Sequence, residues 1–228
     1  PLYSSAASDV YKRQETIWSL MNKNFLALTV AASALAFSAS AAVSSNIVGY
    51  VKVPLKLGLN LVANPLNNTN PNGNKISSLF AGQTCSVLRW NGSGFGSTDL
   101  FEGVVVGGVD GDLAPGEGFF ADMGGDVSLT WVGEALVGTQ SVNVGANNSF
   151  VASKIPLAGT ATELGLAPAD SISALTWDNA SSSFKSYDYF AGAGWIGSLG
   201  EPSFAVAQGF LVQSGAAFTW TKTFTPAN

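Results

Sequence analysis

One stretch of the chain has the residue types that grip a sugar ring: Ser186-Tyr187-Asp188-Tyr189-Phe190-Ala191-Gly192-Ala193-Gly194-Trp195. Aromatic faces stack on such a ring, while neighbouring carboxylates and amides hydrogen-bond to its hydroxyl groups. The stretch therefore predicts a glycan-binding site made by Tyr187, Asp188, Tyr189 and Trp195. The alternative is that the aromatic side chains cover a seam inside the protein.

A second stretch, from Asp99 to Asp126, holds seven carboxylates and no Lys or Arg. Calcium prefers hard oxygen ligands on loops, and Asp110-Gly111-Asp112 has the close spacing of part of a calcium loop. One interpretation is a calcium site at Asp110, Asp112 and Glu117, although a complete EF-hand pattern is missing. The other is an acidic surface that is only solvated. No other cofactor is expected.

The composition limits the chemistry that the chain can perform. Histidine is absent, which removes the commonest general base and the commonest transition-metal ligand. Zinc sites and the usual serine or cysteine triads are therefore not expected. A glycoside hydrolase needs only two carboxylates, so that class stays open, but no motif selects a pair. We predict a protein that is not an enzyme and has no catalytic residues.

Charge and cysteine usage narrow the partners further. Residues 42–228 carry seven Lys and Arg against 13 Asp and Glu, a formal net charge of −6. Nucleic acid is not expected as a partner, because phosphate binding needs a cationic face. Cys85 is the only cysteine, so an intramolecular disulfide is impossible. It is expected to be a buried, inert thiol, with an intermolecular disulfide as the alternative.

The elements that must position these residues occur in two copies. The motif Asn60–Leu66 returns as Ser149–Leu157, with Pro65-Leu66 placed opposite Pro156-Leu157. Four landmarks keep one order at nearly one spacing, which is hard to obtain by chance. The landmarks and their offsets are Val62 and Val151 at 89, Trp90 and Trp177 at 87, Gly118 and Gly209 at 91, and Trp131 and Trp220 at 89.

The repeat predicts an all-β fold of two tandem homologous units, residues 42–136 and 137–228, each a small β-sandwich or barrel-like unit. Short apolar runs between Gly and Asn favour strands over helices. A short helical turn is expected in each unit, at 76–80 and at 162–166. The four recurring tryptophans are expected to form the cores. The expected strands cover 47–53, 59–63, a run ending at Trp90, 118–122 and 127–132, with counterparts in the second unit at 140–144, 150–152, a run ending at Trp177, and two last strands that contain Gly209 and Trp220.

Two motifs resemble those of a family of secreted bacterial β-repeat domains, mostly uncharacterised. The first is Gly58-Leu59-Asn60-Leu61-Val62-Ala63-Asn64-Pro65-Leu66, with Leu59 where an aromatic is commoner. The second is Leu113-Ala114-Pro115-Gly116-Glu117-Gly118-Phe119-Phe120, a full match, whereas Val206–Leu211 lacks the Pro-Gly pair. Pro115-Gly116 suits a type II turn, and Gly118 opens a strand where two backbones come close. The resemblance implies an extracellular or envelope-exposed β module and carries no catalytic residues.

The N-terminal region has features of processing. Residues 4–14, SSAASDVYKRQ, can be written with permitted codons as a common sequencing adapter, so residues 1–20 are interpreted as an artefactual, untranslated leader that contacts neither repeat. Met21–Ala41 has a basic residue, an apolar stretch and a small-residue cleavage site, as a secretory signal peptide has. The fold is thus expected to follow a signal-peptide helix, and the protein is expected to be secreted or exposed on the cell envelope. The mature chain shows no transmembrane segment.

The combined prediction is a non-catalytic adhesion, extracellular-matrix or glycan-binding module. Its expected partner is an extracellular polysaccharide or the envelope surface. The main alternative is a structural subunit that self-associates through exposed edge strands into a fibre or a layer. A glycoside hydrolase that uses Asp and Glu is a third possibility.

Overall fold

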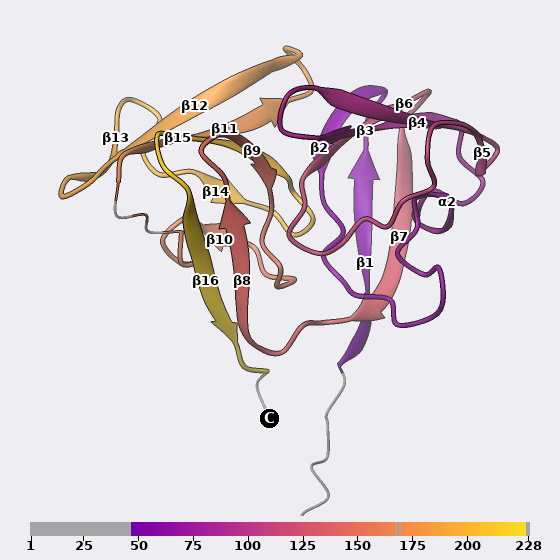
Figure 1. Ribbon diagram of the computed structural model, residues 1–228, viewed down its shortest axis with the longest axis horizontal. Helices are drawn as coiled ribbons and strands as arrows, with labels where there is room; N and C mark the ends of the chain where they lie inside the picture. Colours follow the sequence, from indigo (N-terminus) through magenta and orange to yellow (C-terminus); the bar gives the residue numbers. More distant parts are fainter. Residues whose placement is uncertain (1–46, 167, 169, 227–228) are drawn as a thin grey trace, which may run out of the picture. The chain divides into compact units, whose positions relative to one another are not determined.

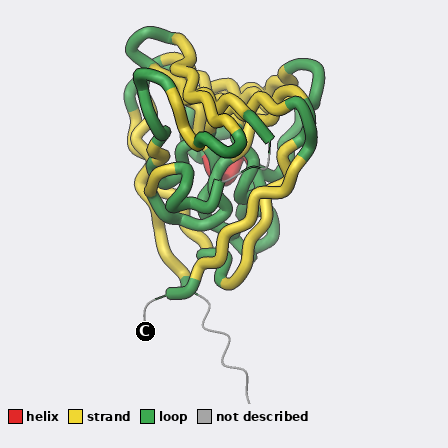
Figure 2. The backbone as a smooth tube through the Cα atoms, turned by 90° about the vertical axis from the view of Figure 1, so that its left-hand side faces the viewer, coloured by secondary structure: helices red, strands yellow, loops and turns green. Residues whose placement is uncertain are grey.

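A computed structural model of the chain describes residues 47–166, 168 and 170–226 (Figure 1). Antiparallel strands make up nearly all of the regular structure, which confirms the all-β class. Figure 2 shows these strands joined by loops, with the four residues of α2 (Ile76–Leu79) as the short red segment. Residues 1–20 and 21–41, interpreted above as a leader and a signal peptide, lie outside the described residues.

The first repeat, residues 47–136, contains a two-stranded and a five-stranded sheet. In the smaller sheet β1 (Val48–Leu55) pairs with β7 (Val127–Glu134). The larger sheet has the order β2-β6-β3-β4-β5. Its strands are β2 (Gly58–Val62), β3 (Cys85–Trp90), β4 (Phe95–Phe101), β5 (Val104–Gly107) and β6 (Phe119–Met123).

The second repeat, residues 137–226, has the same strand order. β8 (Gly138–Val144) pairs with β16 (Phe218–Phe224), and a larger sheet runs β9-β15-β11-β12-β13. At 162–166, where a short helical turn is expected, the chain forms a hydrogen-bonded turn in which the Leu164 amide donates to the Thr160 carbonyl four residues before it. The remaining strands are β9 (Asn147–Val151), β10 (Gly159–Thr160), β11 (Ile172–Asp178), β12 (Ser183–Phe190), β13 (Gly194–Ile196), β14 (Ser203–Phe204) and β15 (Phe210–Ser214).

Of the two stretches expected to supply ligand-binding residues, the aromatic one is mostly strand, whereas Asp110, Asp112 and Glu117 of the acidic one lie between β5 and β6. The acidic stretch includes β4 and β5, and the aromatic stretch includes β12 and β13. In β4 the buried Thr98 and Leu100 alternate with exposed residues such as Asp99. Charged residues on the open face of a strand thus look like a loop in the sequence, because only the alternate positions are buried.

Each repeat has its own hydrophobic core, and only two of the four recurring tryptophans belong to these cores. Trp131 is 2% exposed and its indole N–H donates to the Leu79 carbonyl at 2.8 Å. Trp220 is 4% exposed and donates in the same way to the Leu164 carbonyl at 2.8 Å. Trp90 and Trp177 are half-buried on the opposite face of their strands, so their expected place in the cores is wrong.

The recurring motif at Asn60–Leu66 has a structural explanation. Asn64 accepts the amide of Leu66 two residues on, and Ser153 accepts the amide of Ile155 in the same way. Leu66 and Ile155 are both buried, whereas Leu157 is 39% exposed. The equivalent of Leu66 is therefore Ile155, which corrects the alignment with Leu157.

Candidate ligand cleft at the seam of the repeats

The two repeats meet through hydrogen bonds that are related by a pseudo-two-fold axis. The Trp177 indole donates to the Leu59 carbonyl of β2 at 2.8 Å. The Trp90 indole donates to the Asn148 carbonyl of β9 at 3.2 Å. Leu59 and Asn148 hold equivalent positions in the repeats, so each hairpin tip caps the edge strand of the other repeat.

Backbone hydrogen bonds extend the same arrangement. The Gly209 amide donates to the Leu61 carbonyl at 3.2 Å, and the Gly118 amide donates to the Phe150 carbonyl at 3.1 Å. A Cβ on Gly118 would lie 2.9 Å from both the amide nitrogen and the carbonyl oxygen of Val151. A Cβ on Gly209 would lie 2.8 Å from the Val62 carbonyl oxygen. The expected close approach of backbones at Gly118 is confirmed, and the neighbouring backbone belongs to the other repeat.

The turn before Gly118 and the turn before Gly209 have the same shape but different sequences. Gly116 has φ 95°, and the Glu117 amide donates to the Ala114 carbonyl at 3.2 Å, as a type II turn at Pro115-Gly116 requires. In the second repeat Ala207 has φ 65° at the position of Gly116. This conformation is uncommon for a residue with a Cβ. Ala207 is 7% exposed and packs in the core of the first repeat.

Aromatic side chains other than the predicted ones fill the seam. The ring of Phe120 lies 5.3 Å from that of Trp177, edge to face, and 5.8 Å from that of Phe150. Trp90 packs against Phe95 and Phe150 at 5.2 and 5.7 Å. The seam therefore depends on residues at the tips of the hairpins and on the edge strands.

A cleft of about 670 Å³ lies beside this seam and takes residues from both repeats. Its volume falls in the range of small-molecule sites. The first repeat supplies the β1–β2 turn and the loop after β6, and the second repeat supplies the β11–β12 hairpin. The lining residues are Lys56, Leu57, Asp126, Thr176, Trp177, Asp178, Asn179, Ala180, Lys185, Tyr187, Ser203 and Gln208.

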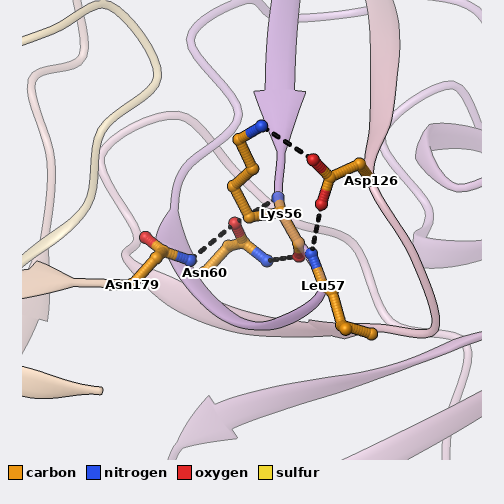
Figure 3. Close-up of polar contacts among 5 residues, drawn as sticks. All are labelled: Lys56, Leu57, Asn60, Asp126 and Asn179. Carbon is orange, nitrogen blue, oxygen red and sulfur yellow. Dashed lines mark hydrogen bonds and ion pairs between the residues drawn. The ribbon is translucent and has the colours of Figure 1, made fainter. Parts of the chain in front are cut away.

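On the side of the first repeat, Asp126 fixes the rim of the cleft (Figure 3). It accepts the Lys56 ammonium at 2.7 Å and the Leu57 amide at 2.9 Å. These hydrogen bonds, led by that from Lys56, hold the pKa of Asp126 below its usual value. Asn60 closes the same turn by accepting the Lys56 amide at 2.8 Å, and Asn179 reaches across from the second repeat to Asn60 at 2.9 Å.

On the side of the second repeat, Asp178 and Lys185 form an ion pair across the β11–β12 hairpin at 2.7 Å. The hydrogen bond from Lys185 is the main reason that the pKa of Asp178 is lowered, and the same bond raises the pKa of Lys185. Asp178 also accepts the Ala180 amide at 3.0 Å. Both groups therefore stay charged across the neutral range.

The repeat gives the seam a second corner, whose residues hold positions equivalent to those of the cleft. This second corner contains an ion pair. Arg89 holds the place of Thr176, and Glu117 holds the place of Gln208. The guanidinium donates to the two oxygens of Glu117 at 2.6 and 2.9 Å. This bidentate pair stands where the second repeat has the smaller Thr176 and the uncharged Gln208.

The structure separates the four residues of the predicted glycan site. Tyr187 lines the cleft. Tyr189 and Trp195 are cross-strand partners with rings 5.4 Å apart, and they pack against the core of the second repeat. Asp188 lies on the other face of β12, where it accepts the Ser173 hydroxyl at 2.7 Å. These four residues do not form one site, and only Tyr187 reaches the cleft.

The three predicted calcium ligands have other partners. Glu117 is paired with Arg89, and Asp110 accepts both the amide and the hydroxyl of Ser77 at 2.9 and 2.8 Å. Asp112 forms a backbone bridge with Lys75. Within the described ranges no group of three or more His, Cys, Asp or Glu side chains could hold a metal ion.

Sequence reasoning missed Lys56, Asp126, Asp178 and Lys185 as cleft residues. Lys56 and Asp126 are 70 residues apart, and neither belongs to a motif. A comparison of the two copies could have pointed to the cleft, because Arg89 and Glu117 of the first copy are replaced by Thr176 and Gln208 in the second.

Comparison with known proteins gives no relative for this chain. No family model matches it, and no match was found among curated proteins or solved structures. Among the described residues, no helix has the length and apolar character needed to span a membrane.

Proposed function

We propose that the protein is a non-catalytic extracellular binding module that holds a glycan in the seam cleft. The observation that carries this proposal is the cleft itself, in which both repeats place aromatic, amide and lysine side chains around one space of about 670 Å³. The equivalent positions of Thr176 and Gln208 hold the ion pair of Arg89 and Glu117, so this lining is not a requirement of the shared fold.

The side chains in the cleft suit a saccharide. Tyr187 lines the cleft, and an aromatic ring there can stack on a sugar. Asn179 and Gln208 add amide groups that can hydrogen-bond to sugar hydroxyls.

The carboxylates of the cleft favour binding over hydrolysis. A glycosidase needs a general acid whose pKa is raised, so that it holds a proton at neutral pH. The pKa values of Asp126 and Asp178 are lowered instead, because each carboxylate accepts hydrogen bonds from a lysine and from a backbone amide.

A glycan array probed with residues 42–228 tests the proposal. Tyr187→Ala should weaken retention of the bound glycan about tenfold or more, since one stacking face is lost. Tyr50→Ala is the matched control, because Tyr50 is 67% exposed on β1 and lies outside the cleft. If both variants retain the glycan equally and their circular dichroism is unchanged, the cleft is not the binding site.

One observation favours the second candidate, a self-assembling subunit. β5 is at the end of its sheet, and its residues Val104 and Val106 are 64% and 66% exposed. An apolar edge strand without charges can pair with another chain. Light scattering over a wide range of protein concentration tests this function, and a monomer throughout would exclude it.

A further inference from the structure

We propose that the seam cleft selects an anionic saccharide, one that carries carboxylate or sulfate groups, over a neutral or a cationic one. This inference rests on the proposed glycan function. The inference follows from the donors and acceptors of the cleft that make no hydrogen bond to the protein itself.

The two lysines of the cleft have donors to spare. The Lys56 ammonium makes one hydrogen bond within the described chain, to Asp126, and the Lys185 ammonium makes one, to Asp178. An ammonium group has three donors. Their side chains are 65% and 52% exposed, so the remaining donors are accessible from the cleft.

The two carboxylates are more fully used. Asp126 accepts Lys56 on one oxygen and the Leu57 amide on the other. Asp178 likewise accepts Lys185 on one oxygen and the Ala180 amide on the other. Each carboxylate thus uses two of about four acceptor sites, and each ammonium group uses one of three donors. In the second pair Lys185 is also the more exposed group, at 52% against 24% for Asp178, so an incoming anion reaches these donors more easily than an incoming ammonium reaches the acceptors.

The two amide side chains of the cleft differ in what they leave unused, since Asn179 donates to the Leu59 carbonyl and to Asn60 and so leaves its carbonyl oxygen. Gln208 uses its carbonyl oxygen to accept the Ala205 amide, which leaves its N–H groups for a ligand. The two lysines come from different repeats, so an acidic saccharide that contacts both would bridge the seam.

The net charge of the chain does not oppose this selection at short range. Charges more than about 8 Å apart are largely screened at physiological ionic strength, whereas a hydrogen-bonded ion pair is screened less. The preference should therefore arise from direct contact, and it should weaken as salt is added.

Calorimetric titration of residues 42–228 with four probes tests the proposal: oligogalacturonate, its neutral methyl ester, chitosan oligomers and dextran sulfate. We expect oligogalacturonate or dextran sulfate to bind at least about tenfold more tightly than the ester and chitosan, since hydrogen bonds to charged groups are the stronger ones. Tighter binding of only one of the two anions would identify the charged group that the cleft takes.

Variants locate the effect. Lys185→Gln should weaken binding of the anionic probe about tenfold and leave that of the methyl ester unchanged. Lys52→Gln is the control, because Lys52 is exposed on β1 and outside the cleft.

Equal affinity for oligogalacturonate and its ester, with dextran sulfate no tighter, would overturn the anionic preference and leave the glycan function intact. A glycan array without any hit, with all four probes failing to bind, would overturn both.

Discussion

The two corners of the seam are made by equivalent positions of the repeats and hold different side chains. In one corner the Arg89 guanidinium donates two hydrogen bonds to the Glu117 carboxylate. In the other, Thr176 and Gln208 leave a cleft of about 670 Å³ with Tyr187 on its wall. The fold is thus maintained by what the repeats share, and a ligand site can arise where they differ.

The shared part of the seam explains why glycine recurs in both copies. Gly118 and Gly209 each lie against the backbone of the other repeat, so a methyl group there has no room. The turn sequence before them is free to change from Pro115-Gly116 to Val206-Ala207, since only the turn shape must be kept.

The largest effect is expected from adding a methyl group to these glycines. Gly118→Ala and Gly209→Ala should each lower the free energy of unfolding by about 3 kcal/mol, because the two backbones must separate. Gly215→Ala is the control, since a Cβ there meets nothing within 4 Å. Urea unfolding measures all three, and a loss at Gly215 as large as at Gly209 would contradict this account of the seam.

A smaller effect should distinguish the two cores. Burial, followed by the nearby Asp122 carboxylate, raises the pKa of the Cys85 thiol to about 11 from an ordinary 9.0. Below pH 9 the thiol is protonated in both the folded and the unfolded chain, so it does not change the free energy of unfolding. Between pH 9 and about 11 the unfolded chain loses this proton first, so the free energy of unfolding should fall by about 2 kcal/mol.

The matched variant for this pH effect is Cys85→Ile, because Ile172 holds the equivalent position in the second repeat. Chemical denaturation at several pH values should show no such loss in this variant beyond that of the exposed groups. If the wild type and the variant lose the same stability between pH 9 and 11, the buried thiol is not the cause.

The smallest effect comes from exchanging the two corners. Thr176→Arg with Gln208→Glu should reduce glycan affinity at least about tenfold, because the larger side chains would enter the cleft. Arg89→Thr with Glu117→Gln should leave affinity at the open corner unchanged. Binding that survives the first pair of substitutions would place the ligand elsewhere.

Part of this structure could be predicted from the sequence because the repeat is visible as spacing. The all-β class and the core positions of Trp131 and Trp220 follow from alternation and recurrence. Trp90 and Trp177 recur just as regularly, but they are on the other face of their strands, and recurrence does not say which face meets the core. Their role depends on a partner repeat that the sequence does not place.

The cleft could not be predicted for the same reason. Asn179 and Asn60 are 119 residues apart, and they meet only because each repeat covers the edge strand of the other. Tyr187 was found for its residue type, while Tyr189 and Trp195 have the same chemistry but turn toward the core of the second repeat. Residue type therefore identified candidates, and packing decided between them.

Titration of the isotopically labelled protein with its best glycan, followed by NMR, tests the central claim most directly. The account predicts that the amide signals of Asn179, Lys185 and Tyr187 shift with one common affinity, while those of Arg89 and Glu117 stay in place. Shifts gathered around Arg89 and Glu117, or on strands far from the seam, would contradict it.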